Sequence, residues 1–239
     1  MNIFKKIKNY FLNALYPQRI KCLFCENELE DDYPICKECL KEDYFNDGTR
    51  CQICDLRIKE DNLICDHCKS NKPMFVKAFC PFIYKGNVRK SILKFKDDGA
   101  KYLAKPFAKF MFNRLQENNI TFDMIVPVPS HKDTIKKRGY NPAKLLADEI
   151  ATLSRRPVVE ALVKNVKTKN QKSLNFKERH ENLIDSITLV NIDLVKGKKI
   201  LLVDDVLTTG ATLNYCSELM HKANEIYVST IARNELKNK

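Results

Sequence analysis

Apolar residues after position 75 fall into two kinds of segment that alternate along the chain. Continuous apolar runs, which are typical of buried strands, cover residues 79–84, 122–129, 198–205 and 225–232. Apolar residues at helical spacing cover residues 87–99, 100–115, 141–154 and 211–222. Because strands and helices alternate, we expect an α/β domain over residues 76–239, with a parallel sheet and helices on both faces.

Prolines and short apolar segments refine this prediction. Pro106 is expected to begin or bend the second helix, because proline lacks the backbone N–H of a helix interior. Asn141 is expected to cap the next helix, with Pro142 in its first turn. Residues 157–166 are expected to be mostly extended, and residues 174–187 mostly helical.

The N-terminal segment 1–19 predicts a basic amphipathic helix, with apolar residues at helical spacing and three lysines between them. Such a helix either lies on a membrane surface or docks on its own protein, and both alternatives stay open. Lysines interrupt the region where a secretory signal would be apolar, and no small-residue cleavage site follows. No apolar run approaches the roughly 18 to 20 residues that cross a bilayer. We therefore expect a cytoplasmic protein, with peripheral membrane contact as an open possibility.

Eight of the ten cysteines form one pattern that occurs twice, 29 residues apart. The first cysteine group is Cys22, Cys25, Cys36 and Cys39, and the second is Cys51, Cys54, Cys65 and Cys68. Two CxxC turns together supply the four thiolates of a structural Zn²⁺ site. Disulfides are the alternative, but they are disfavoured in a chain without a secretion signal. Residues 20–75 thus predict a zinc-ribbon module with one or two Zn²⁺ ions, in which His67 is expected to be a bystander.

Charge is distributed unevenly along the chain, whose net charge is +12. Residues 1–75 contain 12 Lys and Arg against 13 Asp and Glu, whereas residues 76–239 contain 30 against 17. This excess favours a polyanionic partner such as nucleic acid, a phosphorylated metabolite or an anionic membrane surface. Solvated surface lysines are the alternative explanation.

The segment ILLVDDVLTTGAT (200–212) carries the strongest chemical signal. Ligands of parallel sheets bind at the carboxyl ends of strands, where we expect Asp204 and Asp205. The following Thr-Thr-Gly leads into a helix start, whose N–H groups and dipole suit a phosphate. Carboxylates accept hydrogen bonds from sugar hydroxyls or hold Mg²⁺. A sugar-phosphate site is therefore predicted; an acidic turn followed by a helix cap is the alternative.

This segment resembles the phosphoribosyl pyrophosphate (PRPP) signature of type I phosphoribosyltransferases. VPVPSHKDTIKKRGYN (126–141) and the spacing of Gln171, Leu174, Arg179 and Asn182 are similar to segments of the ComF family. The paired CxxC turns resemble that family's double zinc ribbon. Two departures occur: Pro142 stands where the family usually has Gln, and Ser186-Ile187 stands where Ala-Phe tends to occur.

The resemblance implies a type I phosphoribosyltransferase-like sheet with a specific set of site residues. Asp204 and Asp205 would hold the ribose hydroxyls of PRPP, which binds with Mg²⁺. The 5-phosphate would be held by Thr208, Thr209, Gly210, Ala211 and Thr212. The pyrophosphate would be held by Ser130, His131, Lys132 and Arg138. Residues 167–179 would form a flap with Gln171 and Arg179 as contacts.

Two functions follow from the resemblance. ComF proteins are associated with natural transformation, which implies handling of single-stranded DNA (ssDNA) on the cytoplasmic side, together with other DNA-uptake proteins. Basic residues would contact the phosphates, and Tyr84, Tyr102 and Phe176 would stack on bases if they are exposed. The alternative is an active phosphoribosyltransferase, with Asp204, Asp205, Lys132 and Arg138 as catalytic candidates and an acceptor that the sequence does not identify.

Overall fold

The computed structural model describes residues 21–29, 33–58, 63–165 and 186–235. The chain forms two compact units, residues 1–42 and residues 43–239, which we describe separately. Helix predictions for residues 1–19 and 174–185 lie outside the described residues, and the predicted helix end at Ile187 is wrong, because this residue begins strand β5 (Ile187–Leu189). Among the described helices, none is both long enough and apolar enough to cross a membrane.

The first unit contains the first cysteine group. An antiparallel bridge between Lys21 and Glu28 closes the first CxxC turn. Helix α2 (Lys37–Lys41) starts directly after Cys36 and carries the second CxxC turn. Among the described residues of this unit, the four cysteines are buried or half-buried together with Leu23, Phe24 and Ile35.

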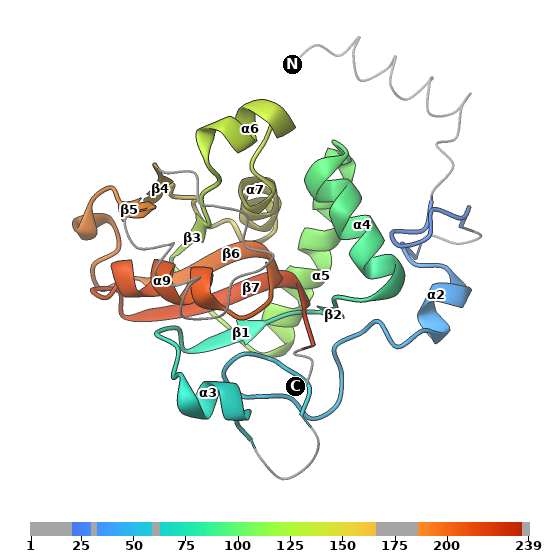
Figure 1. Cartoon of the computed structure of the whole chain (residues 1–239), viewed down its shortest axis with the longest axis horizontal. Coiled ribbons are helices and arrows are strands. Elements are labelled where there is room, and N and C mark those ends of the chain that lie inside the picture. Colours follow the sequence, from blue (N-terminus) through green and yellow to red (C-terminus); the bar gives the residue numbers. More distant parts are fainter. Residues whose placement is uncertain (1–20, 30–32, 59–62, 166–185, 236–239) are drawn as a thin grey trace. The chain divides into compact units, whose positions relative to one another are not determined.

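The second unit is built around a parallel sheet, as the sequence predicted (Figure 1). The strand order is β1-β7-β6-β3, and β2 also pairs with β7. The strands are β1 (Lys77–Phe79), β2 (Phe82–Ile83), β3 (Met124–Pro127), β6 (Lys199–Leu207) and β7 (Glu225–Arg233). A separate antiparallel pair consists of β4 (Leu162–Lys164) and β5 (Ile187–Leu189).

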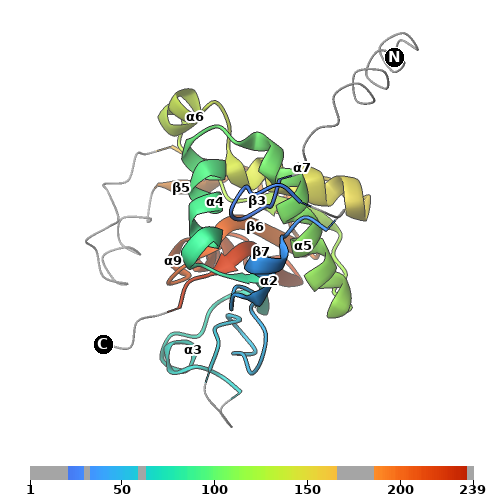
Figure 2. The same cartoon turned by 90° about the vertical axis from the view of Figure 1, so that its right-hand side faces the viewer.

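Helices cover both faces of this sheet, as predicted. Helices α5 and α7 lie on one face, and α9 lies on the other (Figures 1 and 2). The helices are α3 (Asp66–Ser70), α4 (Gly86–Asp97), α5 (Ala104–Glu117), α6 (Lys132–Arg138), α7 (Pro142–Ser154) and α9 (Ala211–Leu219), with short 3-10 turns η1 (Lys101–Leu103) and η3 (Ile192–Leu194). Buried apolar residues fill the space between the sheet and the helices on both faces. Polar side chains that could bind a ligand are therefore expected at the ends of the strands.

Local sequence signals account for two helix starts. The side chain of Asn141 accepts a hydrogen bond from the N–H of Ala143, at 3.2 Å, so the predicted cap is confirmed. Helix α5 begins at Ala104, which places Pro106 in the first turn, where its missing N–H interrupts no helical bond. Pro106 therefore marks a helix start.

Several predicted boundaries differ from the structure; strand β3, for example, covers only Met124–Pro127 of the predicted 122–129. The run 79–84 forms two short strands, β1 and β2, because Pro81 between them lacks an N–H for the sheet. Strand β6 continues past the aspartates to Leu207, because Val206 and Leu207 still pair with Ala232 and Arg233. Helix α9 ends at Leu219, three residues before the predicted end.

Candidate functional site

The two aspartates lie near the carboxyl end of β6, between β7 and β3 in the sheet. Asp205 is only 6 % exposed, whereas Asp204 is half-buried. The Asp204 carboxylate accepts a hydrogen bond from the backbone N–H of Asp205, at 2.8 Å. Consecutive strand residues point to opposite faces, so the two carboxylates have different surroundings.

Lys96 of helix α4 supplies the positive charge beside this pair. Its Nζ lies 2.6 Å from Oδ2 of Asp205. Burial opposes the charged form of this lysine, but the carboxylates of Asp205 and Asp204 outweigh burial and raise the pKa of Lys96. Nothing in the sequence marked this contact, because Lys96 is one of several helical lysines and lies far from Asp205 along the chain. Lys96 thus stabilises one ionised carboxylate of the pair.

Asp204 is harder to ionise than an ordinary aspartate. Burial, followed by repulsion from Asp205, raises the pKa of Asp204 to about 7, although Lys96 and Lys164 act in the opposite direction. Lys164 is the last residue of β4, and burial lowers its pKa despite the attraction of Cys216 and Asp204. A ligand that donates hydrogen bonds or brings a cation would therefore relieve an unfavourable charge.

Residues 208–210, here termed the Thr-Thr-Gly loop, connect β6 to α9. Gly210 has φ +83°, a left-handed conformation that glycine adopts without strain, and it is the residue before Ala211, where α9 begins. A Cβ at Gly210 would make only an ordinary contact at 3.5 Å with Leu207, so glycine serves the backbone conformation here. A small cavity of about 40 Å³ is lined by Asp204 and by Val206, Leu207, Thr208, Thr209, Gly210, Ala211, Thr212 and Leu213. A carboxylate and a helix start therefore share one cavity.

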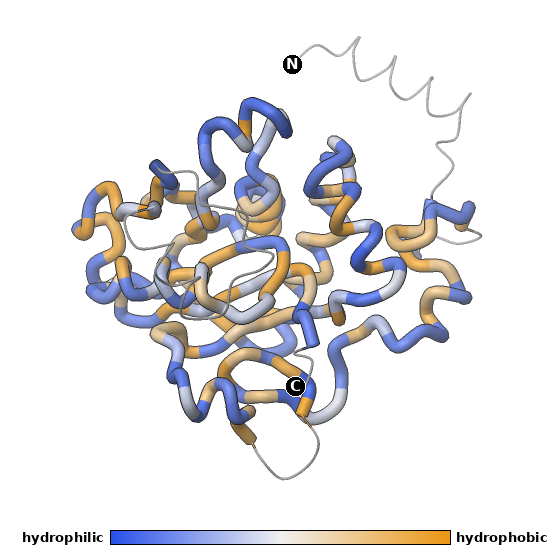
Figure 3. The backbone as a smooth tube through the Cα atoms, viewed as in Figure 1, coloured by the Kyte–Doolittle hydropathy of each residue, from blue (hydrophilic) through white to orange (hydrophobic). Residues whose placement is uncertain are grey.

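The second predicted loop follows β3. Ser130 donates a hydrogen bond to the side chain of Asn141, and His131 caps helix α6 by accepting from the N–H of Asp133. Lys132 is exposed and is the first residue of α6. Figure 3 shows α6 as largely hydrophilic, in agreement with a helix that has no buried residue. Because β3 pairs in parallel with β6, this loop leaves the same edge of the sheet as the Thr-Thr-Gly loop.

Arg138 at the end of α6 faces the end of α4. Its Nη2 lies 2.9 Å from Oδ1 of Asp97. A cavity of about 440 Å³ is lined by Asp97, Asp133, Thr134, Lys137 and Arg138. The predicted contacts of these basic residues with pyrophosphate stay predictions, and Gln171 and Arg179 lie outside the described residues, in the segment that joins β4 to β5.

The cysteine groups have the geometry of four-ligand metal sites. In each group the four sulfur atoms lie within 4.8 Å of one another. The Cys25–Cys36 and Cys54–Cys65 sulfur pairs are both 3.6 Å apart. Sulfur atoms that surround Zn²⁺ tetrahedrally at about 2.3 Å are about 3.8 Å from one another, so both groups fit this ion. Closed four-thiolate sites have no open position for catalysis, and structural Zn²⁺ is the role that they support.

His67 lies outside the second set of sulfur ligands, as predicted, but it is more than a bystander. Its Nε2 lies 3.2 Å from the carbonyl oxygen of Thr209 in the Thr-Thr-Gly loop. Arg233, at the end of β7, donates a hydrogen bond to the carbonyl of Thr208 in the same loop. Neither contact is visible in the sequence, since nothing local marks two residues that meet only through the fold.

Three aromatic residues were predicted to stack on nucleic-acid bases if exposed. Tyr102 in η1 is 69 % exposed and has exposed Lys101 and Lys105 as neighbours. Tyr84 is half-buried, and Phe176 lies outside the described residues. Tyr102 is thus the candidate that meets the condition.

Comparison with known proteins identifies two families in the chain. The Phosphoribosyl transferase domain matches residues 101–232, and the Double zinc ribbon domain matches residues 11–69. The chain is 28 % identical over 223 residues to Competence protein F of Haemophilus influenzae, covering 89 % of this chain and 96 % of that protein. It is 31 % identical over 108 residues to Competence protein ComFC of Bacillus subtilis, covering 45 % and 42 %.

Among solved structures, a purine phosphoribosyltransferase from Pyrococcus horikoshii OT3 matches with a TM-score of 0.34 and 21 % identity, covering 54 % of this chain and 70 % of that one. The match to the Phosphoribosyl transferase domain spans more than half of the chain and therefore identifies the family. The chain therefore belongs to the phosphoribosyl transferase domain family, and a match to the Double zinc ribbon domain precedes that domain.

Proposed function

We propose that this protein binds PRPP, or a related sugar phosphate, at Asp204, Asp205 and the Thr-Thr-Gly loop. The observation that carries the proposal is the cavity that Asp204 shares with residues 206–213. A ribose diol would donate to the carboxylates, and the 5-phosphate would accept from N–H groups at the start of α9, which have no acceptor inside the helix. Membership of the phosphoribosyl transferase domain family supports the same ligand class.

In this proposal the remaining site residues, basic and polar, act on the pyrophosphate. Ser130, His131, Lys132 and Arg138 would bind its oxygens, and Gln171 and Arg179 would approach from the segment between β4 and β5. Mg²⁺ that enters with PRPP would be held by Asp204 and Asp205, directly or through water, and would neutralise charge on the pyrophosphate. Arg138 would have to exchange its bond with Asp97 for one with the ligand.

Calorimetric titration of the full chain with PRPP and Mg²⁺ tests this site. Asp205→Asn is expected to weaken binding by about tenfold or more, because it removes a charge-assisted acceptor. Asp148→Asn is the matched control, since Asp148 pairs with Lys144 on α7. Equal affinities of the Asp205 variant and the wild type would contradict the proposed site.

For the role in the cell, we propose handling of single-stranded DNA on the cytoplasmic side during DNA uptake. The names of the relatives, both competence proteins, motivate this role. The exposed Tyr102 between Lys101 and Lys105 offers a base-stacking face next to phosphate-binding charges. The excess of Lys and Arg after residue 75 adds sequence-neutral attraction to a phosphate backbone.

Fluorescence anisotropy with labelled oligo-dT tests the DNA contact. Tyr102→Ala is expected to lose about 1–3 kcal/mol of binding free energy, whereas Tyr102→Phe should retain most of it because the ring remains. Affinity should fall steeply between about 50 and 200 mM salt if phosphate contacts dominate. Absence of binding at about 50 mM salt would rule out direct DNA contact.

Deletion of the gene in a transformable host, with complementation by wild-type and Asp204→Asn/Asp205→Asn proteins, tests the link to DNA uptake. The wild-type protein should restore transformation and the double variant should not. Fractionation of the same cells tests the proposed cytoplasmic location and any peripheral membrane contact. Unchanged transformation in the deletion strain would reject the cellular role while leaving the sugar-phosphate site open.

An active phosphoribosyltransferase is the second candidate, favoured by the same carboxylate pair and by the family match. The reaction would displace pyrophosphate from C1 of the sugar, with Lys132 and Arg138 stabilising the leaving charge. Pyrophosphate release measured with a panel of nucleobases tests this reaction. Turnover that Asp205→Asn abolishes would support the enzyme, and PRPP binding without turnover for any base would favour a binding role.

A further inference from the structure

We infer that the second cysteine group positions the Thr-Thr-Gly loop for phosphate binding, through Arg233 and His67. The inference rests on the proposed sugar-phosphate site and adds a positioning mechanism to it. The residues that carry it all lie in the second unit.

Arg233 contacts both the second cysteine group and the Thr-Thr-Gly loop. On one side, its Nε donates to the carbonyl of Cys54 at 2.9 Å, and its Nη2 lies 3.6 Å from the Cys54 sulfur. On the other side, its Nη1 donates to the carbonyls of Leu207 and Thr208. Arg233 is 2 % exposed and is the largest fully buried side chain among the described residues. One rigid guanidinium therefore spans from a metal ligand to the loop.

The charge of Arg233 explains why the metal site matters. Within the part of the chain that the structure describes, its hydrogen-bond partners are carbonyls and the Cys54 sulfur, and no carboxylate is paired with it. A buried cation is costly without a compensating negative charge. Four thiolates around one Zn²⁺ leave two net negative charges, so the loaded second cysteine group supplies this compensation. Metal loss would remove the charge and the fixed sulfur that hold the guanidinium in place.

The orientation of the peptide planes explains how anchoring of the loop carbonyls would affect phosphate binding. The carbonyls of Leu207, Thr208 and Thr209 point to Arg233 and His67. The described chain has no cis peptide bond, and in a trans peptide the N–H points opposite to the carbonyl of the same plane. The N–H groups of residues 208–210 therefore point away from the ribbon, toward the side on which a phosphate would bind. Three anchored carbonyls thus aim three N–H donors.

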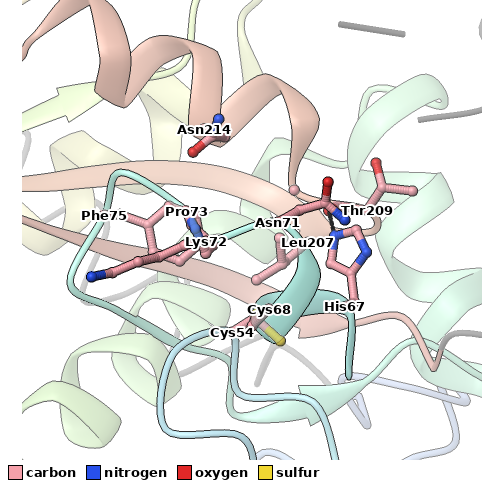
Figure 4. A pocket seen from close by; sticks show the side chains of 11 residues that line it. Cys54, His67, Cys68, Asn71, Lys72, Pro73, Phe75, Leu207, Thr209 and Asn214 are labelled. Carbon is pink, nitrogen blue, oxygen red and sulfur yellow. Dashed lines mark hydrogen bonds between the residues drawn. The ribbon is translucent and has the colours of Figure 1, made fainter. Parts of the chain in front are cut away.

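His67 and a second cavity complete the junction. Figure 4 shows the His67 ring beside Thr209, with a contact of 3.2 Å between Nε2 and the carbonyl oxygen. Next to this contact lies a cavity of about 200 Å³. It is lined on one side by α3 and the segment that follows α3, and on the other side by the Thr-Thr-Gly loop and α9. Its lining includes Asn71, Lys72 and Asn214. The loop is thus held on the ribbon side at few points, and loss of Arg233 or His67 would leave it poorly supported there.

A matched pair of cysteine variants tests the inference in the full chain. Cys65→Ser and Cys36→Ser remove equivalent ligands of the second and first cysteine groups. Each should lose about one Zn²⁺ per chain by metal analysis. Cys65→Ser is expected to weaken PRPP binding by about tenfold or more, the usual scale for loss of a supporting contact, whereas Cys36→Ser should change it by less than about twofold. Equal losses in both variants would overturn the inference.

Arg233→Lys keeps the inference testable if Cys65→Ser does not fold. Lysine retains the charge beside Cys54 but lacks the planar fork that reaches both sites. We expect a folded protein with unchanged zinc content and PRPP affinity reduced by about tenfold. Wild-type affinity in Arg233→Lys would also overturn the inference.

Amide hydrogen exchange without PRPP separates this inference from the proposed function. The amides of Asn214 and Asn234, which donate to the carbonyls of Gly210 and Leu207, should exchange faster in Cys65→Ser or Arg233→Lys than in the wild type, and not in Cys36→Ser. If the wild-type protein does not bind PRPP, the sugar-phosphate proposal fails, and the exchange rates alone decide the coupling. Unchanged exchange in both second-group variants would reject the coupling even if PRPP binds.

Discussion

The two cysteine groups are copies of one local structure in different surroundings. The bridge between Lys21 and Glu28 recurs between Arg50 and Arg57, and helix α2 recurs as α3, each 29 residues further along. The N–H of Cys36 donates to the sulfur of Cys22 at 3.3 Å, and its counterpart joins Cys65 to Cys51 at 3.4 Å. The same spacing thus produces the same metal-binding geometry twice.

The second copy has contacts with the sheet region of its own unit. The second copy belongs to the unit that contains the sheet. Asp55 in this copy is 3 % exposed and accepts a hydrogen bond from the N–H of Cys80. Asn46 donates to Asp55 and to the carbonyl of Cys80, which ties the ribbon to the strand region. A duplicated motif can therefore keep its chemistry while one copy acquires contacts with another site.

The largest expected difference between the copies is in stability. Cys51→Ala should lower the melting temperature of the second unit by about 10 °C, because a buried site loses its metal while Arg233 stays buried beside it. Cys22→Ala should leave that transition within about 2 °C. Differential scanning calorimetry measures both, and a common loss in the two variants would show that the copies are energetically equivalent.

Substitution of Asp204, in the proposed sugar-phosphate site, should raise the melting temperature, in contrast to the loss expected for Cys51→Ala. The folded-state pKa of Asp204, about 7, lies above the usual value of 3.8, so the folded protein binds the extra proton between these values and its stability falls as pH rises through this window. Asp204→Asn should therefore raise the melting temperature by about 2–4 °C at pH 8, with a smaller gain at pH 5, and weaken PRPP binding. Melting curves at both pH values test this sign, and a loss of stability at pH 8 would contradict it.

The smallest expected effect distinguishes the copies at one position. His67 and Glu38 occupy equivalent places in the two CxxC turns. His67→Ala should weaken PRPP binding by about threefold through loss of one contact to the Thr209 carbonyl, and Glu38→Ala should leave it unchanged. Calorimetric titration of both variants checks this, with zinc content as the control for folding.

Much of the fold could be predicted because its signals are local. The alternation of apolar runs and helical spacing predicted the parallel sheet, and Asn141 with Pro142 predicted the start of α7. Strand boundaries were less accurate, because β6 extends to Leu207 only through pairing with β7. The run 79–84 divides at Pro81 for a reason that the sequence did contain, since proline lacks the N–H needed for the sheet.

The candidate site was predicted in part. The motif DDVLTTGAT indicated Asp204, the loop and the helix start, which the structure brings to one cavity, whereas Asp205 lies outside its lining and pairs with Lys96. Lys96 was missed, because a lysine on an amphipathic helix looks like any solvated charge until the helix packs beside Asp205. Arg233 was missed for the same reason, since it ends a buried strand and no residue near it in the sequence marks its partners.

The sequence by itself determined the local structures. These are two equivalent cysteine groups, the alternation of strands and helices that builds the parallel sheet, and a glycine that permits the turn before α9. Spacing and residue type suffice for these, because their contacts span few residues. Only the tertiary structure decided that the second cysteine group meets the Thr-Thr-Gly loop. Arg233 and Cys54 are 179 residues apart, and His67 and Thr209 are 142 apart. Such contacts depend on how the whole sheet packs, which local periodicity does not encode.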